Sequence, residues 1–326
     1  MNYINNEVYL DMIKSTIIFN YPASAKSLKV RLVIYNEKDK YFPFIFYMNS
    51  NYDKMTLNYK TLSPHFQYKY KYQVYKSGSW ENLTEYKYFR IEFKDKNAVR
   101  YLLFLNPESK HLSIGFAGNG KRPSYHYVGT ISGIYTNKLF ILDNFSKNTP
   151  NKAAYYIGIN GKKNAMKKVY RLIEQVRKQL NVLKRNVICI GSSKGGFASL
   201  LYALTYGYGH CIVGSPTIFL GNRLMKEGNM SNYVEEIAGH TSENAIKWLN
   251  ELIDNEIIKG AKCDIHLLIG RGESRYTKHV IPFQKMVEPY QNINLELEVL
   301  DFEKHNDLVK YYPNYLREKM KEITNL

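Results

Sequence analysis

Residues 187–204 read VICIGSSKGGFASLLYAL, and the architecture of the chain can be inferred outward from them. The first four residues are apolar, as in a buried strand, and residues 197–204 form an apolar run suited to a helix. Between them lies GSSKG at 191–195, the pattern Gly-x-Ser-x-Gly, whose glycines let the chain reverse sharply around a serine. We therefore predict a strand, a tight turn and a helix, with Ser193 on the turn as a nucleophile.

A glycine-rich turn before a helix has a second use, since its free backbone N–H groups can cradle a phosphate. The phosphate-binding loop of nucleotide-binding proteins places a Ser or Thr after its lysine to hold magnesium. Here Lys194 is followed by two glycines. The sequence therefore favours a nucleophile over a phosphate site.

Serine chemistry needs a histidine to accept the hydroxyl proton and a carboxylate to orient that histidine. In α/β-hydrolases these groups follow the serine in the order acid, then histidine. The apolar run 265–269 is followed by Glu273, and the run 295–300 is followed by a loop containing His305. Both loops leave the carboxyl ends of predicted parallel strands, where ligands bind in open α/β sheets. We predict that Ser193, Glu273 and His305 form a catalytic triad.

Other residues of the same types remain as alternatives. Asp301 is the second choice for the acid because it follows the last predicted strand directly. The weaker alternatives are Asp143 and Asp254 for the acid, and His240 and His279 for the base.

An acyl-transfer site also needs donors for the oxyanion that forms on the substrate. The Lys194 N–H opens the predicted helix, where free amides and the helix dipole favour negative charge. A second donor is expected from the glycine-rich stretch GFAGNG at 115–120, which follows an early strand. We predict that this donor comes from Ala117, Gly118 or Asn119.

Composition and charge limit the class of protein. The chain has 326 residues, of which 44% are hydrophobic, enough for a large α/β domain and a smaller one. The three cysteines lie in or beside predicted strands without the paired spacing of metal ligands, so we expect neither a metal site nor a disulfide. No apolar stretch approaches the roughly 18 residues of a membrane span, and no secretion leader is recognisable. We expect a cytoplasmic protein, with peripheral association at the inner face of the membrane as an alternative.

The formal net charge of +17 favours an anionic partner. Lysines and arginines are scattered singly or in pairs rather than gathered in a basic tail, so a solvated basic surface is the simplest interpretation. Charge alone does not choose among nucleic acid, an acidic polysaccharide and an anionic membrane surface. We expect no specific nucleic acid, and the expectation of an anionic polysaccharide comes from a family resemblance of the motifs in residues 100–310.

Two domains are predicted from the change in sequence rhythm. Residues 1–97 alternate polar and apolar positions, as at 28–34 and 66–73, and are expected to form an antiparallel β-sandwich. Its many aromatic residues, among them Trp80 beyond the turn 76–79, suit core packing, with a glycan-binding platform as an alternative and single-stranded nucleic acid as a weaker one. Residues 98–326 alternate strands with helices, including a helix near 163–183. The fold class is α/β: a mostly parallel sheet covered by helices, like an α/β-hydrolase, with an N-terminal sandwich.

The motifs in this second region also carry a family resemblance. The stretches YYIGING at 155–161, GSSKGGFA at 191–198 and IVGSP at 212–216 resemble the XcbB/CpsF type of capsular polysaccharide biosynthesis protein. More distantly, they are similar to the glycan O-acetyltransferase subunit of accessory secretion systems. The resemblance covers roughly residues 100–310 and is most specific at the serine turn. These families usually offer aspartate as the acid, whereas this chain has Glu273 at the position we favour.

The resemblance implies a serine-dependent acyl transfer on a bacterial surface polysaccharide. Ser193 is implied as the nucleophile and His305 as the base. The expected reaction is O-acetylation of a sugar hydroxyl with acetyl-CoA as the acyl donor and no bound cofactor. An esterase or deacetylase acting on the same glycan is the first alternative. A non-catalytic, glycan-binding assembly protein with a hydrolase fold is the second.

Overall fold

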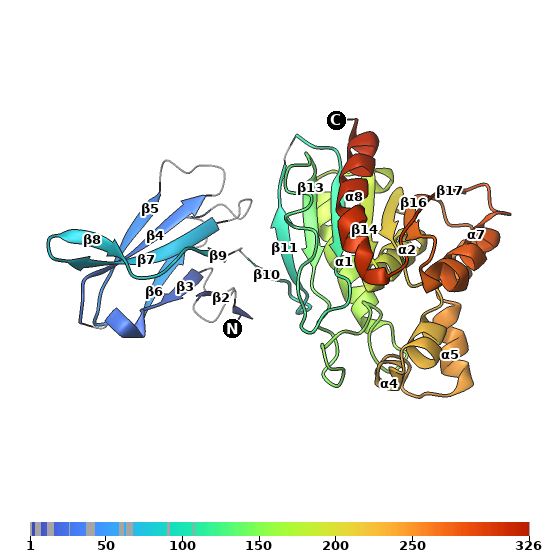
Figure 1. The fold of residues 1–326 in the computed structure, drawn as a ribbon, viewed down its shortest axis with the longest axis horizontal. Helices are drawn as coiled ribbons and strands as arrows, with labels where there is room; N and C mark the ends of the chain where they lie inside the picture. The colour runs from blue at the N-terminus through green and yellow to red at the C-terminus, as the bar shows by residue number, and fades with distance from the viewer. Residues whose placement is uncertain are drawn as a thin grey trace. The chain divides into compact units, whose positions relative to one another are not determined.

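The computed structural model describes residues 2–3, 8–11, 16–25, 27–36, 43–58, 62, 68–89, 92–106 and 108–325. The chain divides into two compact units, residues 1–104 and 105–326. Figure 1 shows the helices and strands of both units.

The first unit contains two antiparallel sheets. One sheet runs in the order β1 (Asn2–Tyr3), β2 (Val8–Asp11), β3 (Thr16–Asn20), β6 (Lys54–Asn58). The other runs in the order β5 (Phe44–Met48), β4 (Val30–Asn36), β7 (Tyr68–Lys76), β8 (Ser79–Asn82), and β9 (Lys87–Phe89) also pairs with β7.

Alternating residues of both sheets share one core. Val30, Leu32 and Ile34 of β4 are buried in the same apolar cluster as residues of β3 and β6. Phe19 of β3 contacts Tyr70 of β7 edge to face, with ring centroids 5.5 Å apart. This packing confirms the predicted antiparallel sheets near the N-terminus. The first two residues of the predicted strand 66–73 lie outside the described residues.

A sheet of eight strands carries the parallel part of the fold. Its order is β10 (Phe93–Lys94), β11 (Arg100–Phe104), β13 (Asn137–Ile141), β12 (Leu112–Phe116), β14 (Val187–Ser192), β15 (His210–Gly214), β16 (Cys263–Gly270), β17 (Ile293–Leu300). The six strands from β13 to β17 pair in parallel, whereas β10 and β11 are antiparallel. Strands of the central part, such as β12 and β13, are buried along their whole length, as expected where helices cover both faces.

Helices on opposite faces of this sheet meet the ends of the same two strands. A Cβ at Gly191 would point at α2 (Lys194–Tyr206), whereas one at Gly214 would point at Tyr312 of α8 (Leu308–Thr324). Figure 1 shows α8 lying across the sheet. The remaining helices and helical turns are α1 (Asn164–Gln179), η3 (Lys184–Asn186), α3 (Leu220–Asn222), η4 (Arg223–Glu227), α4 (Ser231–Ala238), α5 (Glu243–Asn250), α6 (Asp254–Ile258), η5 (Tyr276–Val280), α7 (Ile281–Val287) and η6 (His305–Asp307).

The predicted α/β fold class is thereby confirmed. Because β14, β16 and β17 are parallel, the loops that follow them leave the same edge of the sheet. These loops carry Ser193, Glu273 and His305. None of the helices in the described ranges is long and apolar enough to span a bilayer.

Candidate active site

Ser193 stands on a strained turn between β14 and α2. Its backbone has φ 53° and ψ −117°, a conformation that residues other than glycine rarely adopt. Two close approaches force this turn: a Cβ on Gly191 would lie 2.4 Å from the backbone of Gly195, and one on Gly195 would lie 2.2 Å from the carbonyl oxygen of Phe116. The Ser193 N–H donates to the Gly214 carbonyl at 3.0 Å, which fixes the turn against β15. The serine is thus held in the geometry of a nucleophile elbow.

Glu273 and His305 meet at the edge of the sheet, although 32 residues separate them. The Nδ1 atom of the His305 ring lies 2.6 Å from Oε1 of Glu273. Glu273 is only 3% exposed. The other carboxylate oxygen accepts a bond of 2.6 Å from the Ser215 hydroxyl, and Arg275 donates to Oε1 at 3.2 Å. The carboxylate therefore fixes the orientation of the histidine ring.

Glu273 is held ionised despite its burial. Burial, the largest single effect, would raise the pKa of this carboxyl, but hydrogen bonds from His305 and Ser215 lower it. The nearby charges of His305 and Arg275 act in the same direction, so the pKa of Glu273 lies below its ordinary value. An ionised carboxylate can only accept hydrogen bonds, so the His305 Nδ1 carries the hydrogen and leaves Nε2 as the basic atom.

Asp301 does not contact the His305 ring. Its side chain is 89% exposed and pairs with Arg271 at 3.1 Å. Of the four carboxylates considered from the sequence, Glu273 is the one bonded to His305. Asp143 instead pairs with a lysine, and Asp254 lies at the start of α6.

The alternative bases are placed elsewhere. His279 is fully buried, and its Nδ1 accepts the Phe219 N–H at 3.1 Å. Burial and the neighbouring cations, led by Arg275, lower the pKa of His279 to about 4, so this ring is a neutral acceptor. His240 is exposed and shares a hydrogen bond with Ser242.

A cavity of about 560 Å³ joins the elbow to the histidine. Its lining includes Ser193, His305 and the described residues Gly118, Asn119, His126, Tyr127, Tyr155, Thr217, Arg223, Arg275 and Tyr312. Within the described part of the chain, no hydrogen bond joins the Ser193 hydroxyl to the His305 ring. Catalytic hydrogen bonds are often long in unliganded enzymes and tighten only when substrate binds.

The backbone N–H groups of the predicted oxyanion donors differ in whether they already donate a hydrogen bond within the protein. Lys194 is the first residue of α2, and within the described residues its N–H donates no hydrogen bond. The Ala117 N–H donates to the Tyr156 hydroxyl at 2.8 Å, and Ala117 does not line the cavity. Gly118 and Asn119 do line it, but the Gly118 N–H donates to the His126 ring. Among the described residues, the Lys194 and Asn119 amides are therefore the predicted donors whose N–H groups have no hydrogen-bond partner; Asn119 lines the cavity, and Lys194 directly follows the lining residue Ser193.

The side chain of Lys194 has a role that sequence reasoning missed. Its ammonium lies 2.7 Å from Asp143 and only 4% of the side chain is exposed. It also lies 5.0 Å from the ring centroid of Tyr156. Asp143 follows β13, far from Lys194 in the sequence, so no local pattern indicates this buried ion pair. The pair anchors the first turn of α2, which directly follows Ser193.

Two tyrosines that sequence reasoning also missed brace the strand before the elbow. The Tyr127 hydroxyl accepts the Ser192 N–H at 3.0 Å and lies 2.7 Å from the Ser192 hydroxyl. Burial raises the pKa of Tyr127 to about 12, so it stays protonated. The Tyr312 hydroxyl lies 2.7 Å from the Ile212 carbonyl and accepts the Gly191 N–H at 3.2 Å. Tyr312 thus joins α8, which begins just after His305, to the strands beside Ser193.

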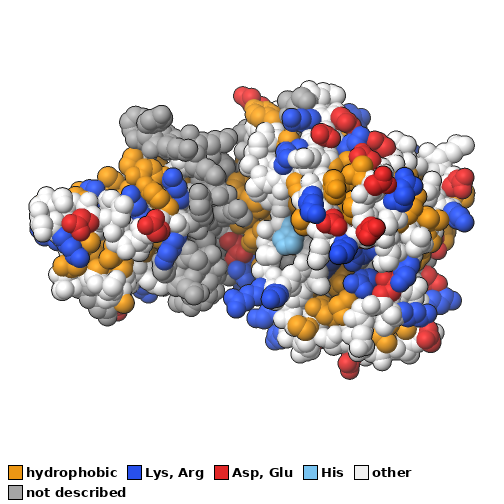
Figure 2. Space-filling view, in the orientation of Figure 1, with side chains coloured by type: hydrophobic (Ala, Val, Ile, Leu, Met, Phe, Trp, Pro, Cys, Tyr) orange, Lys and Arg blue, Asp and Glu red, His pale blue; other side chains and the backbone are white. Residues whose placement is uncertain are grey.

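The cavity is positively charged. Arg223 and Arg275 both line it, and its described lining contains no Asp or Glu. Arg275 is 7% exposed, and its Nε has no hydrogen-bond partner among the described residues. Figure 2 shows that over the visible outer surface of the second unit, by contrast, basic and acidic side chains are intermingled. The two arginines of the cavity lining therefore favour an anionic group there.

Comparison with known proteins places the fold. No family model and no curated protein sequence matches the chain. Among solved structures, the chain is similar to the Glycosylation Associate Protein (Gap123) complex from Streptococcus agalactiae, with a TM-score of 0.58, 13% identity and 98% of this chain covered. The chain spans 66% of the length of that protein.

Two further structures cover shorter parts of this chain. The capsule O-acetyltransferase of Neisseria meningitidis serogroup A gives a TM-score of 0.60 and 18% identity over 71% of this chain and 94% of that one. An S-formylglutathione hydrolase from Agrobacterium tumefaciens gives 0.53 and 12% identity over 77% and 98%. The chain therefore has the fold of α/β-hydrolase-type enzymes.

Proposed function

We propose that this protein is a serine acyltransferase that O-acetylates an anionic bacterial surface polysaccharide. The observation that carries the proposal is the hydrogen bond between His305 and the buried Glu273, which lies beside the same cavity as the strained Ser193 turn. The similarity in fold to a capsule O-acetyltransferase supports the choice of reaction. The resemblance of the serine turn supports membership of the XcbB/CpsF-type family.

The first half of the proposed reaction forms an acyl-enzyme. The Ser193 oxygen attacks the thioester carbonyl of acetyl-CoA while its proton passes to Nε2 of His305. The oxyanion receives hydrogen bonds from the Lys194 N–H and the Asn119 N–H. The C–S bond then breaks, and the histidine returns the proton to the departing thiol. Glu273 stabilises the charged ring while it carries the proton.

The second half transfers the acetyl group to the acceptor. A sugar hydroxyl gives its proton to His305 and attacks the acetyl-serine, and Ser193 recovers the proton as its ester bond breaks. Arg223 and Arg275 favour an acceptor with a negative group near the reacting hydroxyl, or the phosphates of the donor. We place this reaction in the cytoplasm, where acetyl-CoA is available.

Hydrolysis is the second candidate, because the fold is also that of an S-formylglutathione hydrolase. In that case water replaces the sugar hydroxyl in the second half. Release of CoA thiol from acetyl-CoA, with and without an acidic polysaccharide, separates the two. Release that requires the polysaccharide indicates a transferase, whereas the same release in water alone indicates a hydrolase.

Labelling with a fluorophosphonate tests the proposed nucleophile independently of the acceptor. We expect rapid labelling of the parent and none of the Ser193→Ala variant. Ser199→Ala is the matched control, since Ser199 lies buried in α2 and its hydroxyl has no partner among the described residues. An unlabelled parent protein would refute the proposal and favour a binding protein. Equal labelling of the Ser193→Ala variant would refute the assignment of Ser193 as the nucleophile.

A further inference from the structure

The outer face of the five-stranded sheet in the first unit is unusually rich in aromatic and basic side chains. Strands β4, β5 and β7 contain Arg31, Lys69, Lys71 and Lys76 and no acidic residue. Successive side chains of a strand point to opposite faces, so Arg31 and Tyr75 lie on the face away from the core residues Val30 and Val74. This face therefore combines positive charge with exposed rings.

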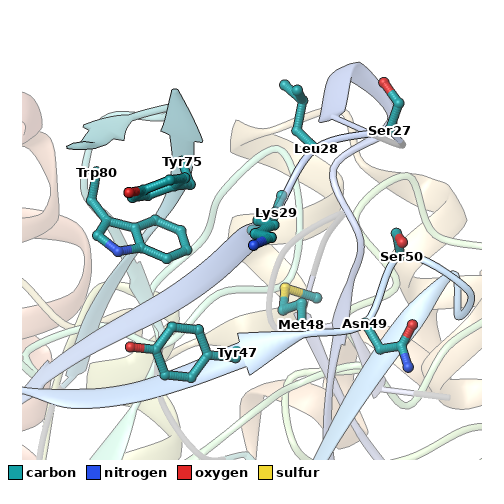
Figure 3. A pocket seen from close by; sticks show the side chains of 10 residues that line it. Ser27, Leu28, Lys29, Tyr47, Met48, Asn49, Ser50, Tyr75 and Trp80 are labelled. Atoms are coloured by element: carbon teal, nitrogen blue, oxygen red, sulfur yellow. The ribbon is translucent and has the colours of Figure 1, made fainter. Parts of the chain in front are cut away.

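A groove of about 600 Å³ lies on this face, within the size range of ligand sites. Figure 3 shows Trp80, Tyr75 and Tyr47 on one side of the groove, with Lys29 and Met48 beside them. The polar residues Ser27, Asn49 and Ser50 lie on the other side. The ten described lining residues include one cation and no carboxylate.

The three rings form a fixed corner. The Tyr75 and Trp80 centroids are 5.3 Å apart with planes at 60°, and Tyr47 lies 5.8 Å from Trp80 at 56°. The Arg31 guanidinium lies 4.4 Å from the Trp80 ring centroid and donates to the Gln73 side chain at 2.8 Å. Tyr47 is nevertheless 70% exposed. Exposed rings that surrounding contacts hold in place are typical of a binding surface rather than of a core.

We propose that this groove binds an acidic oligosaccharide. A sugar ring presents C–H bonds that pack on aromatic faces and hydroxyls that hydrogen-bond to amides and hydroxyls, as the two sides of the groove require. Lys29 lines the groove and Arg31 lies beside it against Trp80, so both favour a negatively charged chain. Stacked nucleic-acid bases are fitted less well, because neighbouring rings inclined by 56° and 60° offer no parallel platform for successive bases. The groove extends the proposed function by holding the polymer on which the second unit acts.

The test uses the full chain and the fluorescence of Trp80. The chain has two tryptophans, so Trp248→Phe leaves Trp80 as the sole reporter, and Ser193→Ala removes any turnover. This variant is titrated with oligomers of alginate and polysialic acid, and with maltohexaose and oligo-dT. We expect saturable binding of at least one acidic oligosaccharide with a change in Trp80 emission, and weaker binding of maltohexaose and oligo-dT.

Tyr47→Ala on the same background should weaken this binding about tenfold or more. Tyr52→Ala is the matched control, because Tyr52 is 65% exposed in the same unit but does not line the groove, and it should bind like the parent. Failure to bind any acidic oligosaccharide, equal affinity of the Tyr47→Ala variant, or tighter binding of oligo-dT would overturn the inference. Because binding is read without turnover, its failure is distinguishable from unlabelled Ser193, which would refute the proposed chemistry instead.

Discussion

The charge of Glu273 can be tested separately from its shape by replacing it with glutamine. In the native site, Oε1 accepts bonds from His305 and Arg275, and Oε2 accepts one from the Ser215 hydroxyl. A glutamine can keep its oxygen toward His305 and turn its NH₂ group toward Ser215, because a hydroxyl can accept as well as donate. The Glu273→Gln variant should therefore keep the correct histidine tautomer and lose only the negative charge.

The size of the effect follows from that distinction. Two unit charges roughly 4 Å apart attract by about 4 kcal/mol at an effective dielectric constant near 20. Loss of this attraction when His305 becomes charged should lower kcat by about 10³-fold. Where an amide also imposes the wrong tautomer on the catalytic histidine, the loss is about 10⁴-fold. The unbalanced charge of Arg275, which is 7% exposed, would move the Glu273→Gln value toward this larger figure.

Hydrolysis of p-nitrophenyl acetate provides the assay, because it requires acylation of Ser193 but no particular acceptor. Asp301→Asn is the matched control: it removes an exposed carboxylate from the loop after β17 and should leave kcat within a factor of two or so of the parent. A Glu273→Gln variant that folds normally and retains kcat within tenfold of the parent would refute the assignment of Glu273 as the charge that stabilises His305.

Three further predictions concern stability. Lys194→Met leaves the buried Asp143 without its partner and should lower the free energy of unfolding by about 3–5 kcal/mol in urea titrations. The further change Asp143→Leu should restore part of this stability. A double variant as unstable as Lys194→Met would contradict the ion-pair argument. Gly195→Ala places a Cβ 2.2 Å from a backbone oxygen of β12 and should lower the free energy of unfolding by about 1–3 kcal/mol. Gly133 has open space around it, so Gly133→Ala should leave the thermal unfolding temperature unchanged. Equal destabilisation by the two substitutions would contradict the packing argument. Because folding lowers the pKa of Glu273, the ionised carboxylate should stabilise the fold fully above its ordinary pKa of 4.5. This stabilisation should be lost as the pH falls through the lower pKa of the folded state. An acid-unfolding transition at the same pH in the Glu273→Gln variant would contradict this prediction.

Local pattern was enough to predict the elbow and the sheet. Glycines at 191 and 195 and apolar runs on either side are short-range features, and the structure shows the strand, the turn and the helix that they predict. Glu273 and His305 were found because parallel strands bring successive loops to one edge, so chain order alone indicates position. Their hydrogen bond agrees with that prediction, while the assignment of the whole triad stays a prediction.

Contacts between distant segments could not be predicted in this way. Tyr127 lies 65 residues from Ser192, and Asp143 lies 51 residues from Lys194. Nothing in the residues around Tyr127 distinguishes it from the other 29 tyrosines of the chain. The use of the Ala117 N–H by Tyr156 depends likewise on packing between loops. Ser215 could have been named as a candidate site residue, because it lies in the stretch IVGSP that carries the family resemblance. Its hydrogen bond to Glu273 is visible only in the structure.

The contacts of Tyr312 have a consequence for the order in which the site assembles. Ribosomes release a chain from its N-terminus, so β14 and the Ser193 turn emerge well before η6 and α8. Until η6 and α8 dock, the Gly191 N–H lacks its bond to Tyr312 and the cavity beside Ser193 lacks His305. In the proposed mechanism, Ser193 therefore cannot react until α8 has packed against the sheet and brought His305 to the cavity.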